Sequence, residues 1–377
     1  MEVASTFHVV IAGGGPAALE AALKLKLLAA DRIRITFVAP TPTFTYRPLA
    51  VAEPFGLGEV VHFSLPAIAA HLGAELVEGS VAAVDVPAHR VALEDGEELA
   101  FDALLVAVGA EPVEALPGAL TFRGHEDAAA LRHALDELSA GPHRVAFVAA
   151  PASAWTLPLY ELALMTARWA TDQGLRIETW LVTHEGRALG VFGPAVAAEV
   201  AERLETAGVR LWTGACAQCV EAGRLWLDME GGLPVDLAVA LPRPVGRAIV
   251  GLPADEEGFI PVDAQGLVPD APGVYAAGDA TTRAMRQGGL AAQQGDAAAT
   301  AIAVQAGVEV EPETYRPVLR GMLLTGRRPQ YLSRARGEEG RASDEAPWWP
   351  PHKIAGRHLA PYLAAHPELR EAPVGHV

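Results

Sequence analysis

The sequence predicts an α/β fold built on parallel strands, and three stretches lead to that prediction. Residues 9–12 form a short apolar run, a glycine-rich turn follows, and the next run is amphipathic and rich in Ala and Leu. Further apolar runs at 34–40 and 101–110 have the composition of buried strands. Strands that alternate with helices are typical of a sheet with helices packed on its faces.

The turn after the first strand fits the pattern G-x-G-x-x-G/A, with Gly13, Gly15 and Ala18 at the three set positions. Gly13 allows a tight turn, and Gly15 lets the backbone approach a pyrophosphate. Ala18 lets the helix pack close to the strand, and the helix N-terminus offers free N–H groups to phosphates. The turn therefore predicts a dinucleotide site; the alternative is a glycine-rich turn that binds nothing.

Composition limits the classes of function. The chain has 377 residues, 51% hydrophobic and 20% charged, which describes an ordered globular protein with two or three domains. Its net charge of −17 argues against nucleic acid and against electrostatic adhesion to an anionic membrane. The N-terminus resembles no signal peptide, and with two cysteines no disulfide framework is needed. We expect a cytoplasmic protein.

The apolar stretch Val145–Ala167 is the best candidate for a membrane span. Pro151, Pro158 and Glu161 interrupt it, so it is expected to divide into a strand and a helix. We expect no integral membrane segment.

The second strand, at 34–40, should end in an acidic residue that holds a ribose hydroxyl. Ala39 stands there instead, so Thr41, Thr43 or a backbone group would take that contact. A loop is predicted at Phe44–Pro48. Its Arg47 could reach cofactor phosphates or a substrate, and it could equally be a solvated loop arginine.

The next segments are expected to complete a first domain. A helix is predicted at 63–74 and a strand at 75–78. A hairpin is predicted from 91–93 and 98–101, because Asp95-Gly96 between them favours a tight turn.

Three motifs occur in a fixed order along the chain. They are Gly-x-Gly-x-x-Ala at 13–18, Asp-Ala-Leu-Leu-Val-Ala-Val-Gly-Ala at 102–110, and Gly-Val-Tyr-Ala-Ala-Gly-Asp-Ala at 273–280. Together they resemble the two-dinucleotide-domain flavoprotein reductases of the pyridine nucleotide-disulfide oxidoreductase superfamily, over roughly residues 5–305. By pattern the nearest members are sulfide:quinone oxidoreductases and type II NADH dehydrogenases. Val108 departs from the pattern, which usually has Thr there.

The resemblance implies two Rossmann-like three-layer domains, the second inserted in the first, and a short C-terminal segment. The FAD-binding domain would comprise residues 1–111 and 246–312, the NAD(P)-binding-like domain 112–245, and the C-terminal segment 313–377. Within the insertion, strands are expected at 144–148, 177–183 and 209–213, and a first helix at 156–170.

The resemblance also implies non-covalent FAD. Asp279 would accept hydrogen bonds from the ribityl hydroxyls, and Gly288 and Gly289 would free the N–H groups of a long helix for the flavin's pyrimidine oxygen. A plain glycine start of a helix is the alternative for the latter. The predicted FAD contacts are Gly13, Gly15, Pro16, Ala17, Ala18, Arg47, Val81, Ala82, Gly109, Gly278, Asp279, Gln287, Gly288 and Gly289.

The second domain should carry a nicotinamide site at 149–155, but this turn has no glycine. Pro151 lacks an N–H donor, and Trp155 places a ring where a backbone should approach phosphate. The sequence therefore argues against a conventional NAD(P)H site; weak binding could survive through Arg243 and Arg247. Glu161, in a Tyr-Glu pair similar to one in the sulfide:quinone branch, is predicted as a catalytic acid or base near the flavin, or else as an ordinary glutamate between domains.

Cys216 and Cys219 form a C-x-x-C spacing, which can indicate a redox dithiol. Active pairs normally lie at a helix N-terminus, whereas this pair is flanked by strand and turn patterns. We therefore interpret both as core or incidental thiols. No metal site is predicted, since the C-terminal residues His352, His358 and His366 are too scattered.

Beyond Pro312 the chain changes character. A strand or hairpin piece is predicted at 315–325, and a loop or poorly ordered stretch at 334–347. The pair Trp348-Trp349 would belong to a core, a dimer contact or a lid, and Pro361 is expected to break the last helical stretch.

Three functions remain open at this point. The first is an FAD oxidoreductase that passes electrons from a small donor to a quinone-like or other acceptor. The second is a non-catalytic flavoprotein, a sensor or partner subunit, that has lost its donor site. The third is an NAD(P)H dehydrogenase with an unusual nicotinamide site. Partners would be small molecules, with a homodimer left open.

Overall fold

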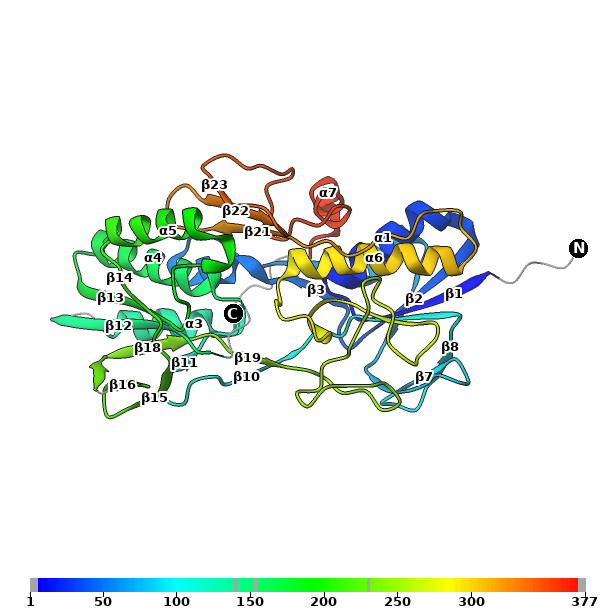
Figure 1. Ribbon diagram of the computed structural model, residues 1–377, viewed down its shortest axis with the longest axis horizontal. Coiled ribbons are helices and arrows are strands. Elements are labelled where there is room, and N and C mark those ends of the chain that lie inside the picture. Colours follow the sequence, from blue (N-terminus) through cyan, green and yellow to red (C-terminus); the bar gives the residue numbers. More distant parts are fainter. Residues whose placement is uncertain (1–5, 139–140, 152–154, 229–230, 372–377) are drawn as a thin grey trace, which may run out of the picture.

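The structure is a computed structural model that describes residues 6–138, 141–151, 155–228 and 231–371. Among these residues, parallel strands form two five-stranded sheets at opposite ends of an elongated molecule (Figure 1). The C-terminal segment, which includes a smaller sheet, lies along one side of both (Figure 1). The predicted α/β architecture is confirmed.

The first sheet has the strand order β20-β9-β1-β2-β5. Its strands are β1 (Phe7–Ala12), β2 (Ile33–Ala39), β5 (Glu75–Glu78), β9 (Ala103–Val106) and β20 (Val274–Ala276). β20 comes from late in the chain and pairs with β9. The described residues between these two strands contribute no strand to this sheet and form an insertion between two of its neighbouring strands.

Both faces of the first sheet are covered. Val9 and Ile11 pack toward the neighbouring helices α1 (Pro16–Ala29) and α6 (Gly288–Gln305), and α2 (Leu65–Leu72) joins the same core. Val10 and Ala12 pack toward a three-stranded layer of β6 (Val81–Asp85), β7 (Arg90–Leu93) and β8 (Glu98–Ala100). This burial on both faces explains why β1 is a continuous apolar run.

The second sheet repeats this plan with the order β11-β18-β12-β13-β14. Its strands are β11 (Leu120–Thr121), β12 (Pro142–Ala149), β13 (Arg176–Thr183), β14 (Arg210–Thr213) and β18 (Leu237–Ala240). The helices of this unit are α3 (His125–Asp136), α4 (Leu157–Asp172) and α5 (Pro194–Thr206). Its second layer consists of β15 (Ala217–Glu221), β16 (Arg224–Leu227) and β17 (Gly232–Pro234). Val145 and Phe147 face the helices, and Ala146 and Val148 face the second layer. The two units are therefore built alike.

A two-stranded ribbon connects the two units. It pairs β10 (Glu111–Val113) with β19 (Arg243–Val245) in antiparallel register. This ribbon lies close to residues 112 and 245, which we keep as our predicted boundaries of the inserted domain.

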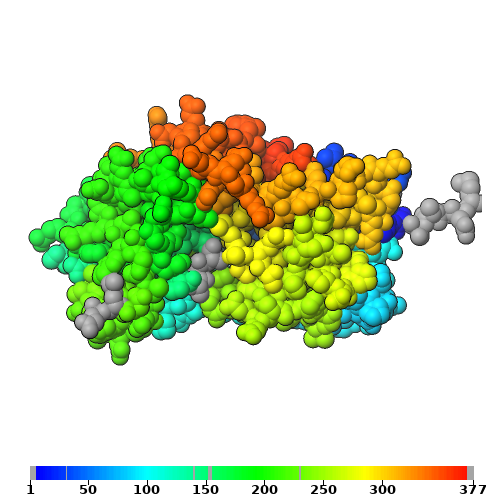
Figure 2. Space-filling view, viewed as in Figure 1, coloured from blue at the N-terminus to red at the C-terminus, as the bar shows by residue number. Residues whose placement is uncertain are grey.

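The C-terminal segment contacts both units. Its sheet contains β21 (Val318–Leu323), β22 (Gln330–Ala335) and β23 (Arg341–Ser343), and α7 (Leu359–Ala365) and the 3₁₀ turn η5 (Pro367–Leu369) follow. Leu319 and Leu332 of this sheet share a core with α4 and α5, whereas Leu359 packs in the core of α1 and α6. In the space-filling view the orange C-terminal residues cover the junction between the green and yellow parts of the chain (Figure 2).

Two predicted loops are wrong in part. Residues 44–48 do not form a simple loop, since β3 (Thr43–Tyr46) pairs with β4 (Val61–Ser64) and Arg47 begins the 3₁₀ helix η2 (Arg47–Phe55). The predicted loop at 334–347 contains the end of β22 and all of β23. In both places pairing with a strand elsewhere in the chain supplies the backbone partners that a polar local sequence does not indicate.

The helix predictions also need corrections. The helix predicted at 63–74 is shorter, because residues 61–64 belong to β4, and α3 was not predicted. Pro361 does not break the last helix but lies in the first turn of α7, where a missing N–H leaves no bond unmade. Among the described helices, none is both long and apolar enough to cross a membrane.

Candidate functional site

The carboxyl ends of β1, β9 and β20 meet at one edge of the first sheet, because these strands are parallel neighbours. Three of the glycines predicted from the sequence, Gly13, Gly109 and Gly278, lie within three residues of the ends of these strands, and all three have positive φ (+129°, +72° and +75°). Ligands of open parallel sheets bind at this kind of edge. The structure thus brings together the three motifs that lie far apart in the sequence.

The turn between β1 and α1 has the properties of a phosphate site. A Cβ on Gly13 would clash with the Ala107 carbonyl, so this glycine is needed for packing, whereas a Cβ on Gly15 would meet no atom within 4 Å. The N–H groups of Gly15, Ala17 and Ala18 have no acceptor among the described residues, although Ala17 and Ala18 are buried. Orphaned donors at a helix N-terminus beside open space fit a pyrophosphate.

Asp279 is the second element of the site. It follows Gly278 in the 3₁₀ turn η4 (Gly278–Ala280) and has no hydrogen-bond or ion-pair partner within the described part of the chain. Burial raises the pKa of its carboxyl, and the Arg286 and Arg47 guanidiniums oppose that shift. A carboxylate held without a partner is costly unless a ligand donates to it. The ribityl hydroxyls of FAD fit this requirement.

The start of α6 supplies further donors. The Gln287 side chain caps the helix, with its amide oxygen accepting from Leu290 N at 2.8 Å. The N–H groups of Gly288 and Gly289 have no acceptor among the described residues. Ile354 packs over this turn, since a Cβ on Gly288 would lie 3.0 Å from its Cγ1. The C-terminal segment therefore covers the helix start that we predicted to meet the flavin.

Other predicted contacts lie around the same sheet edge. Arg47 is exposed at the start of η2, and Val81 and Ala82 begin β6. At the start of β3, the Thr43 hydroxyl donates to the Glu371 carboxylate at 3.0 Å. The Thr43 hydroxyl is therefore already bonded to the C-terminal segment. Any contact with a ribose would be in addition to this bond.

Glu161 lies on α4, on the side that faces η2 and β21. Its carboxylate is fully buried and pairs with Lys353 Nζ at 2.6 and 2.7 Å, and Leu324 N donates to it at 2.9 Å. Burial raises the pKa of Glu161, and the Lys353 ammonium opposes that shift. Lys353 was not predicted from the sequence, because no local pattern marks a partner 192 residues away.

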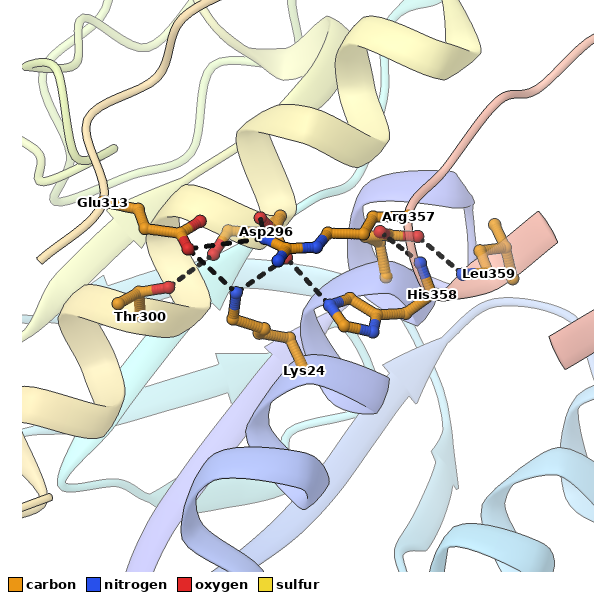
Figure 3. A network of polar contacts seen from close by, with 8 residues as sticks. Lys24, Asp296, Thr300, Glu313, Arg357, His358 and Leu359 are labelled. Atoms are coloured by element: carbon orange, nitrogen blue, oxygen red, sulfur yellow. Dashed lines mark hydrogen bonds and ion pairs between the residues drawn. The ribbon is translucent and has the colours of Figure 1, made fainter. Parts of the chain in front are cut away.

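A polar network connects α1 and α6 to the C-terminal segment (Figure 3). Lys24 Nζ lies 3.2 Å from Asp296 and 3.4 Å from Glu313, and His358 Nε2 lies 3.2 Å from Asp296. The two oxygens of Glu20 accept from the backbone N–H groups of His358 and Leu359, at 2.8 and 2.7 Å. Burial alone would raise the pKa of Asp296, but the neighbouring His358, Glu313 and Lys24 outweigh it and lower that pKa to about 2.

Glu20, Asp296 and His358 lie close enough for three metal ligands, a proximity that the histidine spacing did not predict. Both oxygens of Glu20 are already bonded to N–H groups, and the Lys24 ammonium lies against Asp296. We therefore describe the cluster as a polar network that fastens the C-terminal segment. Its signal in the sequence is the pair Glu20 and Lys24, charged residues at i and i+4 on a helix whose only other charged residue is Lys26.

The corresponding turn of the second domain differs from the first. Residues 152–154 of the predicted nicotinamide turn lie outside the described residues. Of the rest, Trp155 packs its ring on Phe192 with the centroids 6.0 Å apart. Pro158 lacks an N–H, and Leu159 N already donates to the Thr156 carbonyl at 2.9 Å. The start of α4 thus offers fewer free donors than the start of α1.

Cys216 and Cys219 lie at the second layer of the inserted domain, Cys216 just before β15 and Cys219 within it. Burial raises the pKa of the Cys216 thiol, and Asp228 adds to the effect. A raised pKa leaves less of the reactive thiolate. This setting agrees with the interpretation as incidental thiols.

Replacing both cysteines by serine is therefore expected to leave flavin reduction and reoxidation unchanged within about twofold, since the pair lies at a strand layer and not at a helix N-terminus. Stopped-flow traces of the double variant Cys216→Ser, Cys219→Ser beside the parent protein provide the measurement. A large loss of turnover with unchanged circular dichroism would contradict the interpretation.

Comparison with known proteins gives one family match and several relatives. The model of the pyridine nucleotide-disulphide oxidoreductase family matches residues 7–295. A curated sulfide-quinone reductase from Aquifex aeolicus (strain VF5) is 27% identical over 194 residues, which are 49% of this chain and 45% of that protein. The match thus spans less than half of the relative's length.

Two solved structures have a similar fold. The sulfide:quinone oxidoreductase from Aquifex aeolicus has a TM-score of 0.80 at 19% identity, covering 90% of this chain and 87% of that chain. A ferredoxin reductase from Rhodopseudomonas palustris has a TM-score of 0.65 at 20% identity, covering 86% of this chain and 81% of that chain. At these identities the likeness concerns the fold.

Proposed function

Because the chain belongs to the pyridine nucleotide-disulphide oxidoreductase family, we propose that it is an FAD-dependent oxidoreductase that passes electrons from a small donor to a quinone-like or other acceptor. The observation that carries this proposal is the set of unpaired groups at one sheet edge. It consists of the orphaned N–H donors of the first turn and the unpartnered carboxylate of Asp279.

In this proposal each part of the site has one task. The turn Gly13–Ala18 holds the pyrophosphate through backbone N–H groups, and Asp279 accepts from the ribityl chain. Gly288 and Gly289 direct their N–H groups to the pyrimidine edge, where a helix N-terminus favours negative charge. Bound FAD supplies the electron-transfer chemistry, and the protein supplies position and electrostatics.

For Glu161 we propose a positioning role. As an acid or base it would first have to leave its ion pair with Lys353, at 2.6 Å in a fully buried setting. Through that pair it fixes the segment that covers the start of α6. The family relatives named above include a sulfide-quinone reductase, which makes sulfide a donor to test and a quinone an acceptor to test.

We further propose that NADH and NADPH are poor donors. A nicotinamide dinucleotide needs its pyrophosphate held by backbone N–H groups at a helix start. At α4, Pro158 has no N–H and Leu159 N is already bonded. Each charge-assisted hydrogen bond contributes about 1.5–3 kcal/mol. The start of α1 also contains a proline, Pro16, so the difference between the two helix starts is the bonded Leu159 N–H. Loss of one such bond would weaken binding by at least about tenfold.

The donor prediction is tested by anaerobic stopped-flow mixing of the flavin-loaded protein with NADH, NADPH or sulfide. Dithionite is the control, because it shows that the flavin can be reduced. We expect slow, unsaturated bleaching with both nicotinamides. Fast bleaching that saturates at micromolar NADH or NADPH would contradict this and favour an NAD(P)H dehydrogenase.

The same experiment addresses the non-catalytic alternative, which the packing of Trp155 on Phe192 favours. A flavin that dithionite reduces but that neither sulfide nor other small donors reduce would support a sensor or partner subunit. A purified protein that binds no FAD even after incubation with the cofactor would overturn the proposed function altogether.

A further inference from the structure

A cavity of about 510 Å³ lies where three parts of the chain meet. Val191 of the second domain lines one side, and residues 282–285 and Leu290, around the start of α6, line another. The end of β22 and the turn after it, residues 334–337, complete the wall. Figure 2 shows green, yellow and orange parts of the chain meeting on this face of the molecule. The volume is in the range of small-molecule sites.

The charge of the wall is opposite to that of the protein. Three arginines line the cavity, Arg283, Arg334 and Arg336, and none of its described lining residues is acidic. The whole chain has 46 acidic and 29 basic residues. A local concentration of positive charge within an acidic protein attracts anions to that place.

The arginines are positioned by neutral groups. Arg283 lies over the Tyr315 ring, 4.7 Å from its centroid, and donates to the Asp263 carbonyl at 2.6 Å. Arg334 donates to the carbonyls of Val191 and Glu338, at 2.8 and 3.2 Å. Neither guanidinium, nor that of exposed Arg336, has a carboxylate partner among the described residues. The charges of Arg283 and Arg334 are therefore held in place, and none of the three arginines is paired with a carboxylate within the described part of the chain.

The remainder of the wall is largely apolar. Met285, Leu290, Leu319 and Pro317 line it, together with Val191. A ligand that satisfies both parts combines an anionic group, for which arginine is the preferred partner, with an apolar body.

We infer that this cavity binds a small organic anion with an apolar body. Leu290 belongs to the first turn of α6, the turn proposed to meet the flavin. The bound anion is therefore placed beside the cofactor as a substrate of the oxidoreductase. That substrate role rests on the proposed function, whereas the anion site itself does not.

The test compares two probes of the same shape and different charge, 2-naphthoate and 2-naphthamide, by isothermal titration calorimetry on the full chain loaded with FAD. One guanidinium–carboxylate contact that the amide lacks is worth at least about tenfold in affinity. We expect naphthoate to bind at least that much more tightly, and its affinity to fall as salt is added.

Arg336→Glu and Arg327→Glu form a matched pair of variants. Both arginines are exposed, and neither side chain has a partner among the described residues. Arg336 lines the cavity, whereas Arg327 lies in the turn between β21 and β22 outside its lining. We expect Arg336→Glu to lower the affinity for naphthoate at least about tenfold, because it replaces attraction by repulsion. The affinity of Arg336→Glu for naphthamide should stay unchanged. Arg327→Glu should bind naphthoate as tightly as the parent protein does.

The outcomes separate this inference from the proposed function. Equal affinity for the two probes, or equal losses in both variants, would overturn the anion site while the flavin absorbance of the same samples still supports the oxidoreductase. A protein without flavin that still prefers naphthoate would overturn the proposed function and retain the site. An unchanged affinity for naphthoate in Arg336→Glu would likewise contradict the inference.

Discussion

Replacing Gly15 with valine is expected to remove the flavin while the fold stays intact. Gly15 has φ −90° and ψ −171°, a conformation open to any residue, and a Cβ there would meet no protein atom within 4 Å. Valine would instead fill the space proposed for the pyrophosphate. Loss of two charge-assisted hydrogen bonds alone would lower FAD affinity by about a hundredfold or more.

The measurement is the flavin-to-protein ratio from the absorption spectrum, with thermal unfolding as the check on the fold. Gly295→Ala serves as the contrasting variant, because its Cβ would clash with the Ala17 carbonyl between α1 and α6. That variant should lose thermal stability first and flavin only as a consequence. A full flavin complement in Gly15→Val would mean that the pyrophosphate lies elsewhere.

The parts of the site that could be predicted from the sequence are those that short, local sequence patterns indicate. The turn at Gly13–Ala18 has glycine where a backbone must come close to phosphate, next to a strand and a helix with clear periodicity. Asp279 lies in the short turn just after β20. Because parallel strands end at one edge, local predictions of this kind were enough to bring most of the proposed cofactor contacts to one place.

The contacts of the C-terminal segment could not be predicted in this way. Lys353 meets Glu161, the Ile354 N–H donates to the Tyr46 hydroxyl at 2.9 Å, and His358 meets Glu20. Each pair joins residues at least 192 positions apart, and no period or motif indicates which residue is the partner of the other. The predicted loop at 334–347 was wrong in part for the same reason, since β23 exists only through its pairing with β22.

These contacts give the C-terminal segment a role in the site. It connects α4 of the second domain, through Glu161, to Tyr46 and α1 of the first, and Ile354 lies on the start of α6 between them. Burial raises the pKa of Tyr46 to about 12, so its phenol stays neutral. The segment therefore fixes the two domains relative to the proposed flavin. Of the Trp pair, Trp349 is 84% exposed and Trp348 packs on Tyr331, which places Trp349 outside any core.

Replacing Lys353 with methionine is expected to destabilise the protein by about 3–5 kcal/mol, because it leaves the buried Glu161 carboxylate without its counter-charge. Methionine keeps most of the volume, so the effect reports the charge rather than a cavity. Urea denaturation measures it. Arg90→Ala is the control, since its ion pair with Glu98 is about half exposed on both sides, and its loss should cost less than about 1 kcal/mol.

The pH dependence and a double variant identify the cause. Without Lys353 the folded-state pKa of Glu161 lies above its unfolded value, because burial raises it. The folded state then binds more protons than the unfolded state, and the deficit relative to the parent should shrink as the pH falls toward about 5. Adding Glu161→Gln to Lys353→Met removes the stranded charge, while the Leu324 N–H keeps an acceptor. The double variant should therefore be more stable than Lys353→Met alone. A double variant that is equally or less stable, together with a loss of stability in Lys353→Met that does not depend on pH, would show that the two residues are not coupled.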